Sequence, residues 1–387
     1  MRADGRHMTT IAVAGLSARM MAEAASRDGF DVVALDVFGD ADTRRAASAW
    51  RPIGMPGSLR IDATPLLAVL RELAARGDVA GWVAGSGFDG LPHLLSHGAR
   101  LLPLIGTAAC NVRRLRDPAT FFAALQSHRI AHPPTSLQAP ADCSGWLRKD
   151  MHSCGGWHIR DAASAPASIA AHRYYQRRSP GVPLSATFIG NGERALVLGI
   201  NELTVRRIGA HPFVYAGAVG PVDVAPLITA QVDAALRSLV PAFGLRGLCS
   251  LDFMRDGEQF EVLEVNPRPP ASMALYEGRV AGGLMAAHVA ASVEGELPDA
   301  VLPLPVLRGT EIVFARHAMP IDEAAASVIA HWPGTHDLPA EGTTVGARDP
   351  LCSLGASGAS AAQVRDALAS ARAGLLGRLE SLLETST

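Results

Sequence analysis

The sequence predicts an α/β protein, α+β in overall character, built from two or three packed units around a cleft. In its first hundred residues, short apolar runs alternate with helix-like segments, a pattern typical of an open parallel sheet. Residues 184–205 and 247–266 instead carry strand-like alternation and predict an antiparallel core. The length of 387 residues is too great for one ordinary domain.

The N-terminal unit is expected to be a Rossmann-like parallel sheet. We expect strands at residues 10–14, 30–35, 80–84 and near 100–104, with helices over 18–27 and 65–76. The turn at residues 15–19 lacks the GxGxxG spacing that lets the backbone approach a dinucleotide pyrophosphate. A nicotinamide-dependent oxidoreductase is therefore not favoured, and Asp36 is interpreted as a loop residue after its strand.

The rest of the chain predicts a connector, a flap, a core and a closing helix. Residues 115–135 read as a helix ended by Pro133 and Pro134. Strands at 146–149 and 157–159 flank a loop of small residues, 153–156, and this arrangement is suited to closing over a phosphate. A helix over 227–239 separates the core strands, and short strands after Pro303 lead to an amphipathic helix over 361–383.

Composition narrows the possible partners. The chain is 48% hydrophobic and 19% charged, with a formal net charge of -2, so no electrostatic feature favours nucleic acid or an anionic membrane. Residues 1–8 are polar and no apolar run reaches the roughly 20 residues of a membrane span, which predicts neither a signal peptide nor a membrane helix and hence a cytoplasmic protein. The five cysteines lack CxxC spacing, which argues against a disulfide framework or a zinc site.

A predicted hairpin collects oxygen ligands. If residues 249–254 and 260–266 are antiparallel strands, Asp252, Glu264 and Asn266 converge on one face, because residues two apart in a strand point to the same side. Two carboxylates and an amide oxygen suit Mg²⁺. Arg268 follows the rigid Pro267 and is placed to face an acidic substrate. Two acids at this spacing, without further context, would be interpreted as solvated residues of an ordinary surface hairpin. The residues around Asp252 and Glu264 favour a metal site instead.

The basic residues contain one exception. Of 35 Lys and Arg residues, 34 are Arg and only Lys149 is Lys. Lysine is a compact point charge on a flexible stem, whereas arginine is a planar fork, so a tight phosphate pocket can discriminate between them. Because Lys149 also precedes the loop containing Gly155 and Gly156, we interpret it as a phosphate ligand rather than a random surface residue.

The order of these motifs resembles that of the ATP-grasp superfamily, which includes D-alanine ligase and biotin carboxylase. The match suggested here is a branch of predicted ATP-dependent carboligases related to biotin carboxylase. It implies an ATP-grasp fold whose final subdomain is small, β-rich and closed by a helix. The implied divisions are a Rossmann-like pre-ATP-grasp domain at 1–110, a connecting helix and flap at 111–183, a core at 184–300 and a biotin-carboxylase-like subdomain at 301–387.

The resemblance also assigns roles to residues. It implies ATP, two magnesium ions, for which Mn²⁺ could substitute, and catalytic roles for Lys149 and Arg268. Lys149 would contact the α- and β-phosphates, and Arg268 would steady the transferred group. The other ATP contacts implied are Ser153, Cys154, Gly155, Gly156, Gln176, Arg177 and Arg116, and the metal ligands are Asp252, Glu264 and Asn266.

Two departures from the family pattern bear on activity. A second phosphate-binding lysine is expected at the start of the connecting helix, where this chain has Pro118. Arg113, Arg114 or Arg116 could substitute for it, or the contact could be missing. The segment at 150–154 is also bulkier than the usual glycine-rich flap, which leaves the rate of flap closure open.

The activity implied is that of an ATP- and Mg-dependent carboxylate–amine ligase that forms an acyl-phosphate and acts on small molecules. Amino-acid metabolism or the biosynthesis of a methanopterin- or methanofuran-type one-carbon coenzyme is one setting, and a homodimer is compatible with the sequence. Alternatives are an ATP-dependent carboxylase, a phosphoryl-transferring enzyme and a non-catalytic ATP-binding protein. Phe213 and Tyr215 read equally well as core aromatics or as lining of the acceptor side, and His152 and His158 flank the flap.

Overall fold

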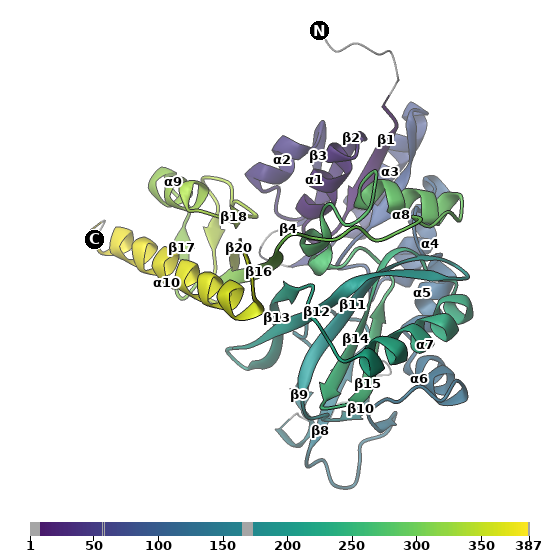
Figure 1. The fold of residues 1–387 in the computed structure, drawn as a ribbon. Coiled ribbons are helices and arrows are strands. Elements are labelled where there is room, and N and C mark those ends of the chain that lie inside the picture. The colour runs from purple at the N-terminus through teal and green to yellow at the C-terminus, as the bar shows by residue number, and fades with distance from the viewer. Residues whose placement is uncertain (1–7, 56, 58, 165–172, 386–387) are drawn as a thin grey trace.

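The computed structural model describes residues 8–385, except 56, 58 and 165–172, so most of the polar N-terminal segment lies outside the described residues. The N-terminal layer is a parallel sheet in the order β3-β2-β1-β6 (Figure 1). All five residues of β1 are buried, with alternate side chains in two different hydrophobic clusters, as expected for a strand covered on both faces. The elements are β1 Thr10–Ala14, α1 Arg19–Arg27, β2 Asp31–Asp36, α2 Ala41–Ala46, β3 Ala49–Pro52, β4 Gly54–Met55, β5 Arg60–Ile61, α3 Ala63–Arg76 and β6 Val79–Ala84.

The strand expected near residues 100–104 is wrong. Helix α4 (Pro92–Leu101) occupies the first part of that segment, and of its residues only Leu104 makes a β-bridge, to Trp82. A short apolar run cannot by itself distinguish a strand from a buried helical turn. Here Pro92 stands in the first turn of α4, a position that favours a helix start. Leu94 and Leu95 follow it as buried residues of the same helix.

Two short helices connect the N-terminal sheet to the rest of the chain. They are α5 (Ala109–Leu115) and α6 (Pro118–Ser127), so the helix expected over 115–135 is shorter than predicted. The Asp117 carboxylate accepts a hydrogen bond from the Thr120 N–H and caps α6. Pro118 occupies the first turn, where its missing N–H costs nothing, so the residue that replaces lysine is a good helix start.

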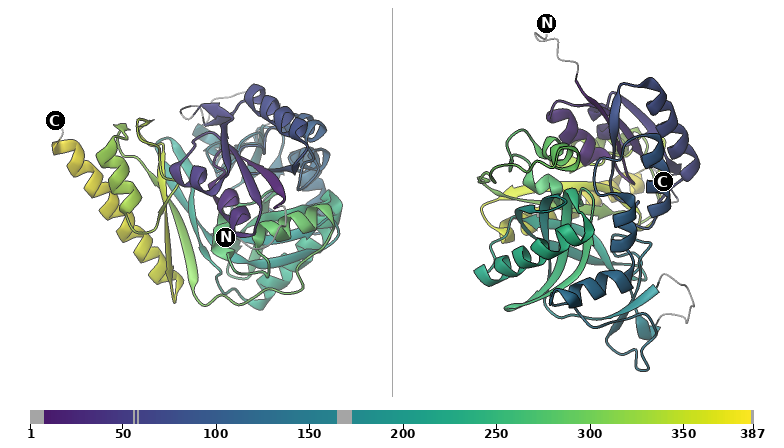
Figure 2. Two further views of the ribbon diagram at one scale, coloured as in Figure 1. Left: turned by 90° about the horizontal axis from the view of Figure 1, so that it is seen from above. Right: turned by 90° about the vertical axis from the view of Figure 1, so that its right-hand side faces the viewer.

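The flap sheet is an antiparallel layer in the order β7-β10-β8-β9, at the opposite end of the molecule from the N-terminal sheet (Figures 1 and 2). Lys149 on β8 pairs with Tyr174 on β10. The returning strand expected at 157–159 is displaced, because those residues form a turn and the chain pairs with β8 only from Arg160. The elements are β7 Thr135–Ser136, β8 Trp146–Asp150, β9 Arg160–Asp161, a 3-10 turn Ala162–Ser164 and β10 Arg173–Arg177.

The core is one antiparallel sheet of eight strands in the order β15-β14-β11-β12-β13-β16-β20-β18. It continues across residue 300, since β13 pairs with β16 from the C-terminal segment. One buried cluster packs α7 and α6 against β11, β14 and β15, which places a hydrophobic layer behind the hairpin. The elements are β11 Val182–Asn191, β12 Ala195–Ile208, β13 His211–Gly220, α7 Pro226–Phe243, β14 Arg246–Asp256, β15 Gln259–Asn266, β16 Leu307–Phe314, β18 Thr335–His336 and β20 Pro350–Gly358.

The C-terminal segment covers the far end of this sheet. Helix α10 (Ala361–Thr385) runs along the outside of the molecule beside β16 and β20, close to the predicted range (Figures 1 and 2). None of the helices in the described part of the chain is both long and apolar enough to span a bilayer. The remaining elements are the 3-10 helix η3 Ala271–Tyr276, α8 Leu284–Val293, β17 Met319–Pro320, α9 Glu323–His331 and β19 Thr344–Val345.

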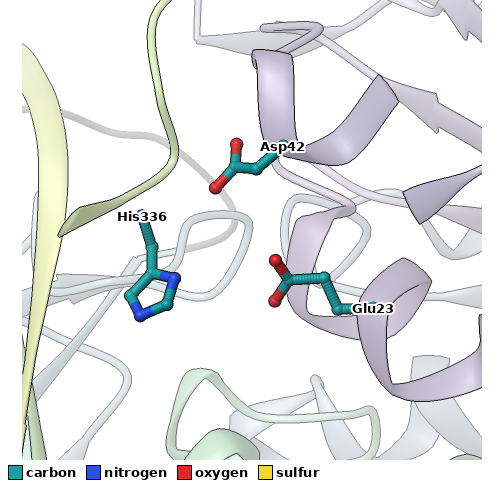
Figure 3. Close-up of side chains that lie close together, drawn as sticks. All are labelled: Glu23, Asp42 and His336. Carbon is teal, nitrogen blue, oxygen red and sulfur yellow. The ribbon is translucent and has the colours of Figure 1, made fainter. Parts of the chain in front are cut away.

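A charged cluster joins the N-terminal sheet to the C-terminal segment. Glu23, Asp42 and His336 bring one ligand atom each within 4.8 Å of one another and converge from three elements (Figure 3). The guanidinium of Arg19 already lies against two of them, with Nη1 2.9 Å from Glu23 Oε2 and Nε 3.7 Å from Asp42 Oδ2. It also donates from Nε to Asp337 Oδ1 at 2.8 Å. We therefore interpret the cluster as a contact between units rather than a metal centre.

Replacing Asp40 beside this cluster with Asn is expected to stabilise the fold at pH 8 by about 1–3 kcal/mol. Burial, followed by the charges of Asp337, Asp36 and Asp42, raises the pKa of the Asp40 carboxyl to about 9. An unfolded Asp ionises near pH ~3.9, so stability is lost as the pH rises from that value toward the folded pKa. Urea titrations at pH 4 and pH 8 check this: the variant should approach wild type at pH 4, and equal stability at pH 8 would contradict it.

Candidate active site

The hairpin predicted from sequence forms, and its three proposed metal ligands, Asp252, Glu264 and Asn266, are here called the metal edge. Asp252 on β14 and Glu264 on β15 are directly paired, and Asn266 is paired with Ser250. The Asp252 carboxylate accepts hydrogen bonds from Ser185 Oγ at 2.6 Å and Asn266 Nδ2 at 3.0 Å, which fix its orientation. Burial and then the neighbouring Glu264 raise the pKa of Asp252. Two carboxylates held this close are a site that gains from a bound cation.

Two arginines reach the same edge and share one buried acid. The Arg268 Nε lies 3.0 Å from Asp89 Oδ1, and Arg116 Nη2 also donates to that oxygen. Arg116 Nη2 donates in addition to Asn266 Oδ1 at 3.0 Å, and its Nη1 lies 3.5 Å from Glu264 Oε2. Burial alone would raise the pKa of Asp89, but Arg268 and Arg116 outweigh it and lower the pKa to about 2. Asp89 is therefore ionised and holds both guanidiniums at the edge.

The question raised by Pro118 has a structural answer. Arg116, two residues earlier, is the arginine that points into the site, whereas Arg113 and Arg114 are exposed. Arg114 lies over the ring of Phe243, on the outside of the connector. Of the three arginines, Arg116 is thus the one whose side chain contacts Glu264 and Asn266.

Lys149 lies on the flap sheet and faces the metal edge. It is 7% exposed, and within the described ranges no hydrogen bond or ion pair involves its ammonium. Burial lowers the pKa of Lys149, while Glu264 and Asp252 are near enough to oppose that shift. A buried cation without a direct partner is costly, so this side of the cleft is suited to an anionic ligand.

The flap loop, residues 153–156, is docked onto both neighbouring units. The Tyr215 N–H donates to the Gly155 carbonyl at 2.9 Å. Gly156 has φ +76°, and a Cβ there would overlap the Phe213 carbonyl oxygen. On the other side, a Cβ at Gly90 would overlap the backbone of His152. This close approach requires glycine at 156, and a φ of +64° favours glycine at 155.

Two other flap residues lie inside the site. Burial raises the pKa of the Cys154 thiol, beside Asp89, to about 11, so it remains a neutral thiol. Burial lowers the pKa of His158 to about 4, and its Nδ1 is enclosed without a partner in the described part of the chain. This lowered pKa keeps the His158 ring neutral, although Glu264 lies near enough to oppose the shift.

Of the remaining predicted nucleotide contacts, Gln176 and Arg177 lie on opposite faces of β10. Gln176 is 1% exposed and its Nε2 has no partner among the described atoms, so the amide is buried on the face shared with Tyr174. Arg177 is exposed and donates to the Ser144 carbonyl at 3.2 Å, away from that face. Ser153 lines a cavity of about 30 Å³ between the flap, α6 and Glu264.

The chain matches a known domain family in this region. Residues 116–272 match the ATP-grasp domain, and this range contains Lys149, the flap and the metal edge. These residues are an ATP-grasp domain. A comparison with curated protein sequences finds no match.

Solved structures extend the ATP-grasp fold to nearly the whole chain. Biotin carboxylase from Campylobacter jejuni is 13% identical, with 97% of this chain and 95% of that chain covered and a TM-score of 0.71. N5-carboxyaminoimidazole synthetase from Staphylococcus aureus, solved with ADP, is 16% identical over 94% and 97%, with a TM-score of 0.70. N5-carboxyaminoimidazole synthase from Aspergillus clavatus, solved with ADP and 5-aminoimidazole ribonucleotide, is 13% identical. The match covers 96% of this chain and 99% of that chain, with a TM-score of 0.69. The ATP-grasp fold, related to that of biotin carboxylase, is thus confirmed.

Sequence reasoning missed Asp89. It lies far from the other site residues in sequence and belongs to no motif, yet it is 4% exposed and binds both arginines. One signal could have found it, because Asp89 follows β6 in a glycine-rich loop at the carboxyl end of a parallel strand, where open α/β sheets bind ligands.

Proposed function

We propose that this ATP-grasp protein is an ATP- and Mg²⁺-dependent carboxylate–amine ligase. The observation that carries the proposal is the opposition of Lys149 to Asp252 and Glu264 across a cleft closed by the flap. A cation facing two carboxylates is the arrangement expected where a metal–triphosphate complex lies between them. Structural relatives solved with ADP support the same use of the cleft.

The donor set fits magnesium. Asp252, Glu264 and Asn266 would hold the ions through oxygen, the element that Mg²⁺ prefers. Bound magnesium would neutralise charge that develops as the γ-phosphoryl group is transferred. In the structure, the Arg116 guanidinium contacts Glu264 and Asn266 and so occupies part of the proposed metal site. We expect this guanidinium to turn toward phosphate when metal and nucleotide bind.

The chain's own residues would position the reactants and exclude water. Lys149 and Arg116 donate to phosphate oxygens, and Arg268, held by Asp89, donates to the carboxylate that attacks the γ-phosphorus. The acyl-phosphate then loses phosphate when an amine attacks its carbonyl carbon. The docked flap keeps water from that intermediate. Such a site works by positioning and charge, which agrees with the neutral, unreactive state of the Cys154 thiol at the site.

Nucleotide admission would require the flap sheet to move. The cavity lined by Ser153, His158, Tyr174 and Glu264 holds about 30 Å³, whereas small-molecule sites are on the order of 300–1,000 Å³. Opening would break the hydrogen bond between Tyr215 N–H and the Gly155 carbonyl, which ties the loop to the core sheet. We therefore expect an open state for binding and this docked state for reaction.

ADP release tests the proposal. The purified chain with Mg-ATP would be assayed against a panel of carboxylates crossed with a panel of amines, including bicarbonate as one carboxylate. A ligase should release ADP only with a matched pair. A non-catalytic protein would bind Mg-ATP without acceptor-dependent release. Release that requires bicarbonate would instead favour the carboxylase alternative, which the fold shared with biotin carboxylase supports.

A further inference from the structure

Tyr215 lies where the core sheet meets the flap. It belongs to β13, pairs with Val205 on β12, and donates its backbone N–H to the Gly155 carbonyl of the flap loop. The next flap residue, Gly156, abuts the carbonyl of Phe213 on the same strand. The flap loop therefore contacts the backbone of β13 on both sides of Val214 in the docked state.

The hydroxyl of Tyr215 is buried and unused. Its oxygen is shielded from solvent and has no hydrogen-bond partner within the described ranges. A buried tyrosine hydroxyl normally finds a partner, because burying it without a hydrogen bond is unfavourable. Burial raises the pKa of Tyr215, so the phenol keeps its proton and can act as a donor near neutral pH.

The charges around this hydroxyl indicate what it could bind. Asp252 and Arg268 are both near enough to influence Tyr215, from the metal edge and from the pair with Asp89 respectively. Arg268 can only donate hydrogen bonds and carries positive charge. A neutral O–H donor beside a guanidinium suits an oxyanion such as a carboxylate or phosphoryl oxygen.

We propose that Tyr215 donates its hydroxyl to an oxygen of the carboxylate substrate, or of the acyl-phosphate made from it, beside Arg268. This inference rests on the proposed ligase function and adds a residue that contacts substrate. Because the flap loop bonds to the backbone of Tyr215, docking of the loop fixes the position of this residue and completes the contact. Flap closure and recognition of the oxyanion are thereby coupled through one residue.

The test replaces Tyr215 with Phe, which removes one oxygen and keeps the ring. Inorganic phosphate, a product of the proposed reaction, serves as the oxyanion probe, and calorimetry measures its binding to the protein–MgADP complex. We expect phosphate affinity to fall about 10-fold, since a hydrogen bond to a charged group contributes roughly 1.5 kcal/mol or more. MgADP affinity should stay unchanged, and stability should equal or exceed that of wild type, because no internal bond is lost.

Tyr175→Phe is the matched control. Tyr175 lies on the face of β10 opposite Tyr174, so the same change there should alter neither affinity. If Tyr215→Phe binds phosphate like wild type, or loses MgADP affinity equally, this inference is overturned while the ligase proposal stands. If wild type binds no MgADP, the ligase proposal fails and the inference falls with it.

Discussion

Replacing Lys149 with Arg is expected to reduce ATP-dependent turnover by at least about 100-fold while leaving the fold intact. The charge is kept, but Lys149 is 7% exposed on the inner face of the flap sheet, where a larger planar group does not fit without displacing its neighbours. Burial lowers the pKa of Lys149, and an arginine would stay fully charged there. Steady-state ADP release with the active substrate pair measures the effect.

The exchange at Lys149 needs a control elsewhere in the chain, and the core sheet offers one. Arg255→Lys, near the far end of β14, reverses the substitution outside the site and should keep wild-type turnover. Thermal melting of both variants separates a catalytic loss from unfolding. Normal turnover by Lys149→Arg would remove the argument that the chain's single lysine is retained for phosphate.

Replacing Asp89 with Asn is expected to destabilise the fold by about 3–5 kcal/mol and to lower turnover. Asp89 is the buried counter-charge of both Arg116 and Arg268, so its loss leaves two neighbouring guanidiniums with only the more distant contact of Arg116 to Glu264. Urea unfolding at pH 7 gives the stability. Because the folded pKa of about 2 lies below the unfolded value of ~3.9, the contribution is present above pH ~4 and is lost as the pH falls toward 2.

Asp78→Asn is the matched control for this variant. Asp78 pairs with Arg76 through two hydrogen bonds of 2.8 and 3.1 Å, but on the surface. Exposed pairs of this kind add little to stability, so the control should unfold like wild type. If the two variants lost equal stability, or if Asp89→Asn showed no loss between pH 5 and 8, Asp89 would not be the anchor of the two arginines.

Local patterns predicted the parts of the fold that depend on neighbouring residues. The strand at β1, the helix at α7 and the hairpin that pairs Asp252 with Glu264 follow from alternation, capping and periodicity within short windows. The strand placed near residues 100–104 failed because a short apolar run fits both strand and helix. The displaced strand after the flap failed because Gly155 and Gly156 lengthen the turn.

The sequence predicted site residues only where they belong to one local motif or stand out by residue type. The carboxylates and Asn266 share a hairpin, and Lys149 stands out by being unique. Asp89 and Tyr215 reach the same cleft from other units, so their roles depend on tertiary packing that no local pattern records. The choice of Arg116 over Arg113 and Arg114 likewise required the direction of each side chain around the end of α5.

The pairing of β13 with β16 limits how the chain can be shortened. Four residue pairs, from Gly217 with Glu311 to Gly220 with Arg308, cover one side of β13 with a strand from beyond residue 300. A fragment ending near residue 300 would lack β16 and would expose unpaired N–H and C=O groups along β13. Such an edge can pair with strands of other chains. The C-terminal segment thus protects the strand carrying Tyr215 from self-association, and the ATP-grasp region is not an independent module.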